Sequence, residues 1–125
     1  MNDMELVLRT VPQPGDINAN GHIFGGWVLS QMDIAGGILA SREAQGPVAT
    51  VAIETMKFIS PILLHDIVSL YANIERRGRT SLAVRIHVVA TRGRGKAEKQ
   101  VDVTNGLFTY VALDKDARPR PLPPE

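Results

Sequence analysis

The chain has 125 residues, of which 14 are Lys or Arg, 13 are Asp or Glu and none is Cys. Its length predicts one domain over residues 1–125 with a core of modest size, and a net charge of +1 gives no bulk attraction to nucleic acid. The lack of cysteine excludes disulfides, thiolate metal sites and a cysteine nucleophile, so we expect a reducing, cytoplasmic environment.

The first strand is predicted in residues 5–11, where β-forming residues alternate with others and prolines follow. The acidic residues before it lack the basic and apolar regions that are typical of a signal peptide. Residues 18–21 read Asn-Ala-Asn-Gly, which is typical of a turn. A helix is expected from about Gly25 to about Glu43, because a Gly-Pro pair follows at positions 46–47.

Four more strands are predicted by alternation, in residues 48–59, 67–75, 81–91 and 99–113. Arg-rich turns at 76–79 and 92–96 either hold phosphate groups or are simply solvated. The last strand is apolar on both faces, which indicates a central strand, with a bulge at Gly106. Residues 114–125 form a Pro- and Arg-rich tail. One long helix and five strands joined mostly by hairpins predict an α+β domain with an antiparallel sheet.

The predicted helix is apolar nearly all round, since residues 23–41 contain a single ionisable side chain, Asp33. This pattern indicates a buried helix, and the carboxylate disfavours a membrane span. Its apolar sides are more than one sheet can cover, so we expect both a curved sheet and a second subunit. A carboxylate in such surroundings needs a partner or a function. Two interpretations stay open: Asp33 pairs with a Lys or Arg, or it belongs to a functional site.

The start of this helix is a second candidate. The amides of Gly25, Gly26 and Trp27 lack partners within the helix and can donate to a carbonyl oxygen that becomes negative during attack. Alternatively, the two glycines only permit tight packing. His22, just upstream, is either an acid–base group or a structural histidine. With no cysteine and three scattered histidines, no metal site is expected.

Several motifs follow one another in a characteristic order. Residues 16–27 read Asp-Ile-Asn-Ala-Asn-Gly-His-Ile-Phe-Gly-Gly-Trp, and residues 30–33 read Ser-Gln-Met-Asp. Further motifs lie in residues 51–61, 78–81, 108–112 and 118–121. Together they cover nearly the whole chain and resemble the signature of hotdog-fold acyl-CoA thioesterases of the YciA-like branch. This resemblance implies a hotdog fold, in which a curved five-stranded antiparallel sheet wraps one long central helix.

The resemblance also implies an assembly and a reaction. Members of this branch form dimers with their sheets joined edge to edge, and three dimers commonly form a hexamer. The substrate is an acyl-CoA, and coenzyme A is part of that substrate rather than a separate cofactor. Asp33 would act at the dimer interface as general base or nucleophile, and amides near Gly26 would polarise the thioester carbonyl. The loop that carries Asn20 and His22 would approach this site, from the partner subunit.

Residues that would bind the coenzyme A portion follow from the same resemblance: Arg79, Thr80, Ser81, Lys57, Phe58 and Arg120. Neither nucleic acid nor a membrane is expected as a partner. One position departs from the pattern, because many relatives have Asp or Asn where this chain has His22. Two other functions are weighed against the thioesterase: a hotdog dehydratase acting on 3-hydroxyacyl thioesters, and an acyl-CoA sensor without catalysis.

Overall fold

The computed structural model describes residues 3–125. Within that range it contains one long helix, five strands and two short 3-10 helices. In chain order these are β1 (Glu5–Thr10), η1 (Pro14–Asp16), α1 (Gly25–Ala44), β2 (Val48–Phe58), β3 (Ile67–Arg77), β4 (Ser81–Arg92), η2 (Gly95–Ala97) and β5 (Lys99–Ala112). The α+β class with one helix and a five-stranded antiparallel sheet is therefore confirmed.

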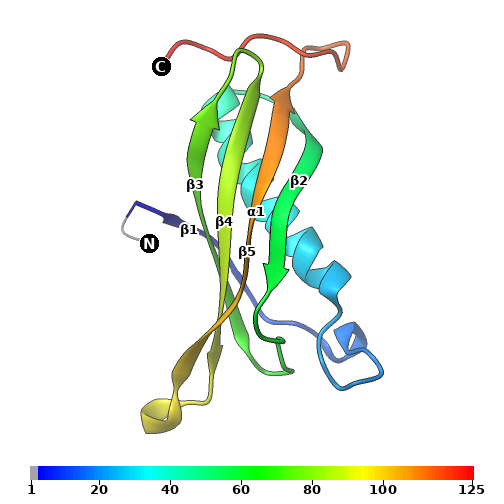
Figure 1. Ribbon diagram of the computed structural model, residues 1–125, viewed down its shortest axis with the longest axis vertical. Coiled ribbons are helices and arrows are strands. Elements are labelled where there is room, and N and C mark those ends of the chain that lie inside the picture. The colour runs from blue at the N-terminus through cyan, green and yellow to red at the C-terminus, as the bar shows by residue number, and fades with distance from the viewer. Residues whose placement is uncertain (1–2) are drawn as a thin grey trace.

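The strands form a single sheet in the order β1-β3-β4-β5-β2, and every neighbouring pair is antiparallel. Figure 1 shows α1 lying across one face of this sheet, with its start near the lower end and its last turn near the upper end. The last strand, β5, lies between β4 and β2, which confirms its predicted central place. Since β2 is an edge strand, its outer backbone groups have no neighbour within the sheet.

The core fills the space between α1 and the sheet. The helix contributes mostly small side chains, with Met32 as its largest buried residue, and the strands contribute larger ones such as Ile86, Phe108 and Tyr110. Gly36 lies so close to the sheet that a Cβ atom there would come within 2.8 Å of Ile86 Cδ1. Small residues on α1 therefore let the helix approach the sheet closely, and burial of the larger strand residues supplies the hydrophobic stabilisation.

One side of α1 and the adjoining strand stay uncovered. Ile34 is 50% exposed and Ile38 is 39% exposed, although both lie in the middle of the helix. In β2, Val51 and Ile53 are 57% and 48% exposed. The hydrogen bond from Thr50 to Asp33 joins β2 to the middle of the helix. The single sheet thus leaves part of the helix uncovered, as its sequence predicted.

An irregularity was predicted at Gly106, but the structure places the extra residues in the neighbouring strand. Glu54 pairs with Leu107 and Lys57 pairs with Asn105, so two residues of β2 face the single Gly106. One of them, Thr55, has a positive φ of 56°. A Cβ at position 106 would lie 2.5 Å from Met56 Sδ. The glycine thus makes room for a bulge in β2 rather than forming one itself.

Residues 114–125 return along the upper end of the molecule (Figure 1). The amide of Arg120 donates to the Ala112 carbonyl, and the amide of Leu122 donates to the Arg79 carbonyl. Leu122 also packs against the core. The tail is thus fastened over the ends of β5 and the β3–β4 hairpin. No helix among residues 3–125 combines the length and apolarity that crossing a membrane requires.

Candidate active site

Asp33 is held by two hydroxyl groups from different strands. Its Oδ1 accepts a hydrogen bond of 2.6 Å from Thr50 Oγ1 on β2 and one of 3.1 Å from the Tyr110 hydroxyl on β5. The same Tyr110 hydroxyl lies 3.0 Å from the main-chain oxygen of Asp33. None of the ion pairs formed among residues 3–125 includes Asp33. The interpretation that this carboxylate is paired with a Lys or Arg is therefore wrong for the single chain.

The Tyr110 hydroxyl remains a hydrogen-bond donor. Burial raises the pKa of this phenol, and the negative charge of Asp33 and the hydrogen bond to it raise the pKa further. An ionised tyrosine beside a carboxylate in a buried position would place two negative charges together. Tyr110 therefore stays protonated over the working range of an ordinary enzyme and offers its proton to Asp33.

The first amides of α1 are open at the surface. Phe24 precedes the helix without a side-chain cap, and among residues 3–125 the Gly25 and Gly26 amides have no hydrogen-bond acceptor. The Trp27 amide already donates to the Phe24 carbonyl at 3.1 Å, so it is not one of the free donors that were predicted. A Cβ at Gly26 would meet nothing within 4 Å, and one at Gly25 would make only an ordinary contact with Phe58. Packing within the chain therefore does not require these glycines.

The loop before the helix is built around Asn18. Its side-chain oxygen accepts hydrogen bonds from the main-chain amides of Asn20 and His22, at 2.9 and 3.1 Å. The main-chain amide of Asn18 donates to the His22 carbonyl at 2.6 Å. The Asn20 side chain is exposed and His22 is half-buried, and neither forms a hydrogen bond with Asp33 in this chain. The structure therefore explains how the loop is shaped, while the catalytic roles of Asn20 and His22 stay predictions.

Lys57 and Phe58 end β2 close to the start of α1. The ring of Phe58 lies against Gly25, and Phe58 lines a surface hollow of about 250 Å³ together with Ile59, Ser60 and Pro61. Phe58 and Ile59 are each at least half exposed, at 50% and 56%. A hollow with apolar walls thus lies beside the free amides, which is a suitable position for part of a thioester substrate.

The other predicted coenzyme A residues lie at the opposite end of the sheet. Arg79, Thr80 and Ser81 form the β3–β4 turn at the upper end in Figure 1, whereas β2 ends at the lower end. Arg120 belongs to the tail at the same upper end and binds main-chain carbonyls there. One chain therefore does not bring these four residues together with Lys57, Phe58 and the helix start, and their binding role stays a prediction.

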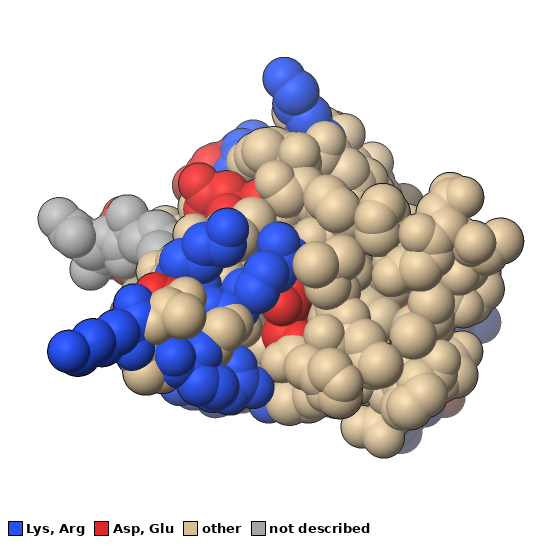
Figure 2. All heavy atoms as spheres, turned by 90° about the horizontal axis from the view of Figure 1, so that it is seen from below, with Lys and Arg blue, Asp and Glu red and all other residues tan. Residues whose placement is uncertain are grey.

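Charge is distributed unevenly over the lower end of the molecule. Figure 2 shows Lys and Arg side chains gathered on one side of this end and uncharged residues on the other. The exposed Arg94, Lys96 and Lys99 belong to the β4–β5 turn, which lies at this end. Arg92 forms two hydrogen bonds with the buried carboxylate of Asp66, at 3.0 and 2.8 Å. Its guanidinium is thus occupied by an internal partner rather than held ready for a phosphate.

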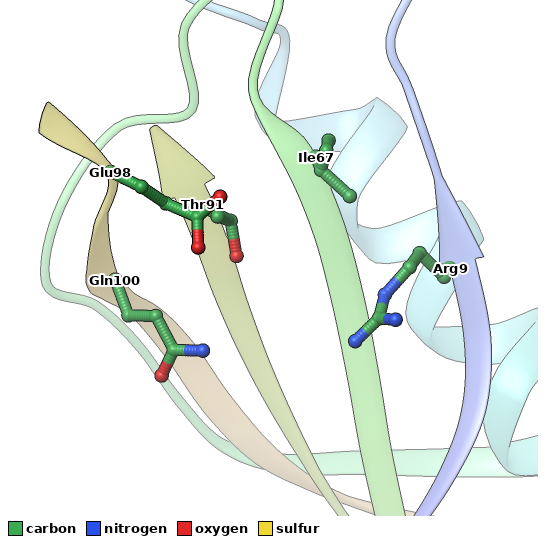
Figure 3. Close-up of a pocket in the computed structure, with 5 residues that line it drawn as sticks. All are labelled: Arg9, Ile67, Thr91, Glu98 and Gln100. Atoms are coloured by element: carbon green, nitrogen blue, oxygen red, sulfur yellow. The ribbon is translucent and has the colours of Figure 1, made fainter. Parts of the chain in front are cut away.

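A second hollow, of about 240 Å³, lies on the face of the sheet that points away from α1. Figure 3 shows the side chains that line it, which come from four neighbouring strand segments: Arg9, Ile67, Thr91, Glu98 and Gln100. Arg9 also donates to Ser69 Oγ at 2.8 Å. None of the predicted catalytic residues lines this hollow, so the candidate active site is on the helix side. Among residues 3–125 no cluster of three or more His, Asp or Glu is placed to hold a metal ion.

Sequence reasoning missed the two residues that fix Asp33. Thr50 and Tyr110 lie 17 and 77 residues away from it in the chain. Tyr110 did carry a signal, because a tyrosine on the core face of a central strand needs a buried partner for its hydroxyl. Thr50 carried none, since threonine is common in strands for reasons of shape alone.

Comparison with known proteins places this site in a family. The sequence model of the thioesterase superfamily matches residues 20–97, which include both the helix start and Asp33. The chain is 50% identical over 123 residues to the acyl-CoA thioester hydrolase YciA of Salmonella typhimurium, with 95% of this chain and 90% of the relative covered. It is 47% identical over 125 residues to YciA of Escherichia coli, with 97% and 92% covered.

Solved structures agree with this assignment. The protein HI0827, described as a hexameric broad-specificity acyl-coenzyme A thioesterase, has a TM-score of 0.88 and 44% identity, over 96% of this chain and 82% of that one. The hexameric thioesterase y2039 of Yersinia pestis has a TM-score of 0.89 and 43% identity, over 98% of both chains. The shared fold, the helix with its Asp33 and the sequence identity lead to one conclusion: this chain belongs to the thioesterase superfamily, in the YciA-like branch of hotdog-fold acyl-CoA thioester hydrolases.

Proposed function

We propose that this protein hydrolyses acyl-CoA to a carboxylic acid and free coenzyme A. The observation that carries the proposal is the carboxylate of Asp33, which is held by two hydroxyls and has no cationic partner among residues 3–125. The free amides of Gly25 and Gly26 are suited to bind the thioester carbonyl oxygen, where negative charge develops during attack. The reaction uses water and these groups alone, so we expect activity to survive dialysis against EDTA.

Two routes fit the geometry. As a general base, Asp33 takes a proton from water while the water oxygen forms a bond to the carbonyl carbon, and the coenzyme A thiolate leaves. As a nucleophile, the carboxylate itself forms that bond, and water then hydrolyses the resulting anhydride. The thiolate is a good leaving group, so neither route requires a strong general acid. A single turnover in ¹⁸O-labelled water tests for the nucleophilic route, because unlabelled product together with a labelled Asp33 arises only when water attacks the Asp33 carbon of the anhydride.

Gly26 and Asp33 serve one thioester only if the site is shared between subunits. Asp33 lies seven positions after Gly26 on α1, which corresponds to roughly 10 Å along the helix. A reacting carbonyl, in contrast, must lie about 3 Å from both the attacking group and the donors to its oxygen. We propose that the Asp33 of one subunit faces the helix start of its partner. The uncovered apolar side chains Ile34, Ile38 and Ile53 support a subunit contact on this side of α1.

The edge strand β2 supplies the place for that contact. Antiparallel pairing of two β2 strands about a two-fold axis would join the sheets and cover the exposed Val51 and Ile53. Such pairing sets the upper end of one sheet beside the lower end of the other. The turn with Arg79, Thr80 and Ser81 would then stand at the same end of the dimer as the partner's helix start. The hexameric state of the two similar structures supports a further assembly of three such dimers.

The test is the release of free thiol from acyl-CoAs of increasing chain length, with wild type and Asp33→Asn. We expect hydrolysis by the wild type and a loss of roughly a hundredfold or more in the variant, as for removal of a positioned acid–base group. Undiminished activity of Asp33→Asn would disprove the role of this carboxylate. Crotonyl-CoA, followed by ultraviolet absorbance, serves as the control for a dehydratase. Because the chain has no cysteine, we also propose a cytoplasmic location, which cell fractionation checks.

A further inference from the structure

One oxygen of the Asp33 carboxylate has two donors and the other has none. Thr50 and Tyr110 both donate to Oδ1, and no residue among 3–125 donates to Oδ2. A carboxylate that is anchored through a single oxygen can present its other oxygen to water or substrate in a fixed direction. The question is which of the two hydroxyl donors is itself fixed firmly enough to set that direction.

Tyr110 is the more rigid of the two donors. Its side chain is 1% exposed, and its ring stacks on Phe108 with ring centroids 6.5 Å apart and planes 20° apart. Its hydroxyl lies against Gly36, where any Cβ atom would overlap it. The hydroxyl also reaches the main-chain oxygen of Asp33 at 3.0 Å and the carboxylate at 3.1 Å. Thr50, in contrast, belongs to the exposed edge strand.

We propose that Tyr110 is a positioning residue for the reaction: its hydroxyl bridges the main chain and the carboxylate of Asp33 and thereby fixes the rotamer that turns Oδ2 toward the thioester. This inference rests on the proposed role of Asp33 in hydrolysis. Tyr110 lies beneath the carboxylate on the core side, so it acts through Asp33 rather than on the substrate. Gly36 is required for this contact, because only a residue without a side chain lets the Tyr110 hydroxyl come this close to α1.

Tyr110 acts as a constant donor rather than as a proton carrier, since burial and the Asp33 charge keep its phenol protonated. It is also the titratable side chain that contacts Asp33. The titratable residues of β2, Glu54 and Lys57, are exposed. The residues of the other strands that form ion pairs do so with partners other than Asp33. A change at Tyr110 therefore reaches catalysis through one carboxylate.

The experiment compares Tyr110→Phe with Tyr71→Phe. Both variants remove one phenolic hydroxyl, but Tyr71 lies on β3 and forms no hydrogen bond with Asp33. For Tyr110→Phe we expect kcat to fall roughly tenfold, the factor for loss of one hydrogen bond to a charged group, with little change in KM. Tyr71→Phe should behave as wild type.

A second measurement keeps Tyr110 in place, so it does not depend on how a substitution at this buried position affects the fold. The chain has two tyrosines, so fluorotyrosine incorporated into Tyr71→Phe reports on Tyr110 alone. Its ¹⁹F signal should shift when Asp33→Asn is added, because the Tyr110 hydroxyl contacts the Asp33 carboxylate. The inference is overturned if Tyr110→Phe keeps the wild-type kcat, if Tyr71→Phe shows the same loss, or if Asp33→Asn leaves the ¹⁹F signal unchanged. If one of these results is found while Asp33→Asn is inactive, only the role of Tyr110 is overturned and the proposed function stands. If Asp33→Asn is active, both the role of Tyr110 and the proposed role of Asp33 are overturned.

Discussion

Arg120 donates a hydrogen bond of 2.8 Å from Nη2 to the main-chain oxygen of Ala44, the last residue of α1. Its Nε donates to the Leu113 oxygen, also at 2.8 Å. A Cβ at Gly46 would lie 2.7 Å from the guanidinium, so a glycine there leaves the space that Arg120 occupies. The cation thus satisfies the Ala44 carbonyl at the negative end of the helix dipole and ties the tail to the helix.

Replacement of Arg120 should therefore lower stability. We expect Arg120→Met to reduce the free energy of unfolding by about 1–3 kcal/mol, the range for hydrogen bonds that involve a charged group. Urea denaturation measures this loss, and an unchanged midpoint would contradict the capping role. Arg120→Lys is the matched control, because it keeps the charge but loses the forked guanidinium donor. Its free energy of unfolding should lie between those of wild type and Arg120→Met. The KM for acyl-CoA, measured on the same variants, tests the separate prediction that Arg120 binds coenzyme A.

The ion pair between Arg92 and Asp66 should contribute more to stability than the other ion pairs among the described residues. Asp66 is 1% exposed, and it also accepts a hydrogen bond of 2.9 Å from the Leu63 amide. The carboxylate raises the pKa of Arg92 through the hydrogen bonds between them. Removing one partner of a buried pair leaves an uncompensated group, so Arg92→Met should cost about 3 kcal/mol.

Thermal unfolding followed by circular dichroism measures this cost. The control is Arg85→Met, which breaks the exposed pair between Arg85 and Glu75 at 3.1 Å and should change stability by less than about 1 kcal/mol. Equal destabilisation by the two variants would show that burial of Asp66 adds nothing to the strength of its pair.

A charge on the edge strand should prevent self-association. Ile53→Asp places a carboxylate at a position that the proposed β2–β2 contact would bury, and a buried unpaired charge is strongly unfavourable. We expect this variant to sediment as a monomer and to lose thiol-release activity. Val11→Asp is the control, since Val11 is exposed to the same degree, at 47% against 48%, but lies outside the sheet. Retention of the wild-type assembly by Ile53→Asp would place the subunit contact elsewhere.

Two inactive variants should restore activity when they share an oligomer. Gly26→Val covers the free amides, and Asp33→Asn removes the carboxylate. If each site combines the helix start of one subunit with Asp33 of the other, a mixed dimer has one site with both groups intact. Co-expression with two affinity tags, followed by tandem purification, yields the mixed species for assay. Lack of activity in it would mean that both groups act within one chain. Gly15→Val, also in open space, is the control for fold.

Much of the architecture was predictable from local patterns. All five strands and the helix were predicted with ends that lie within two residues of the observed ones, because alternation, an uninterrupted apolar helix and Gly or Pro breaks agree along this chain. The main errors concern turns: β3 continues through Arg77 where a turn was expected, and the bulge expected at Gly106 lies across the ladder at Thr55 and Met56. Both depend on pairing between strands, which local patterns do not reveal.

The candidate site was predictable only in part. Asp33 and the Gly25–Gly26 pair stand out because a lone carboxylate and adjacent glycines are unusual in an apolar helix. The residues around them could not be predicted, since Thr50 and Tyr110 reach Asp33 only after the sheet has formed. Arg92 shows the opposite difficulty. Its place in a basic turn favoured phosphate binding or solvation, while its actual partner, Asp66, lies 26 residues away and is buried.

The place of β5 has a consequence for how the protein is made. Strand β2 leaves the ribosome before β3 and β4, yet its only neighbour in the sheet is β5, the last strand to be synthesised. Until β5 inserts, β2 has no neighbouring strand to form hydrogen bonds with. Asp33 likewise lacks the hydroxyl of Tyr110, which lies 77 residues further along the chain. A nascent or truncated chain that lacks β5 therefore contains Asp33 without the Tyr110 hydroxyl that holds it in the finished structure. The proposed hydrolytic activity should therefore begin only with completion of the sheet.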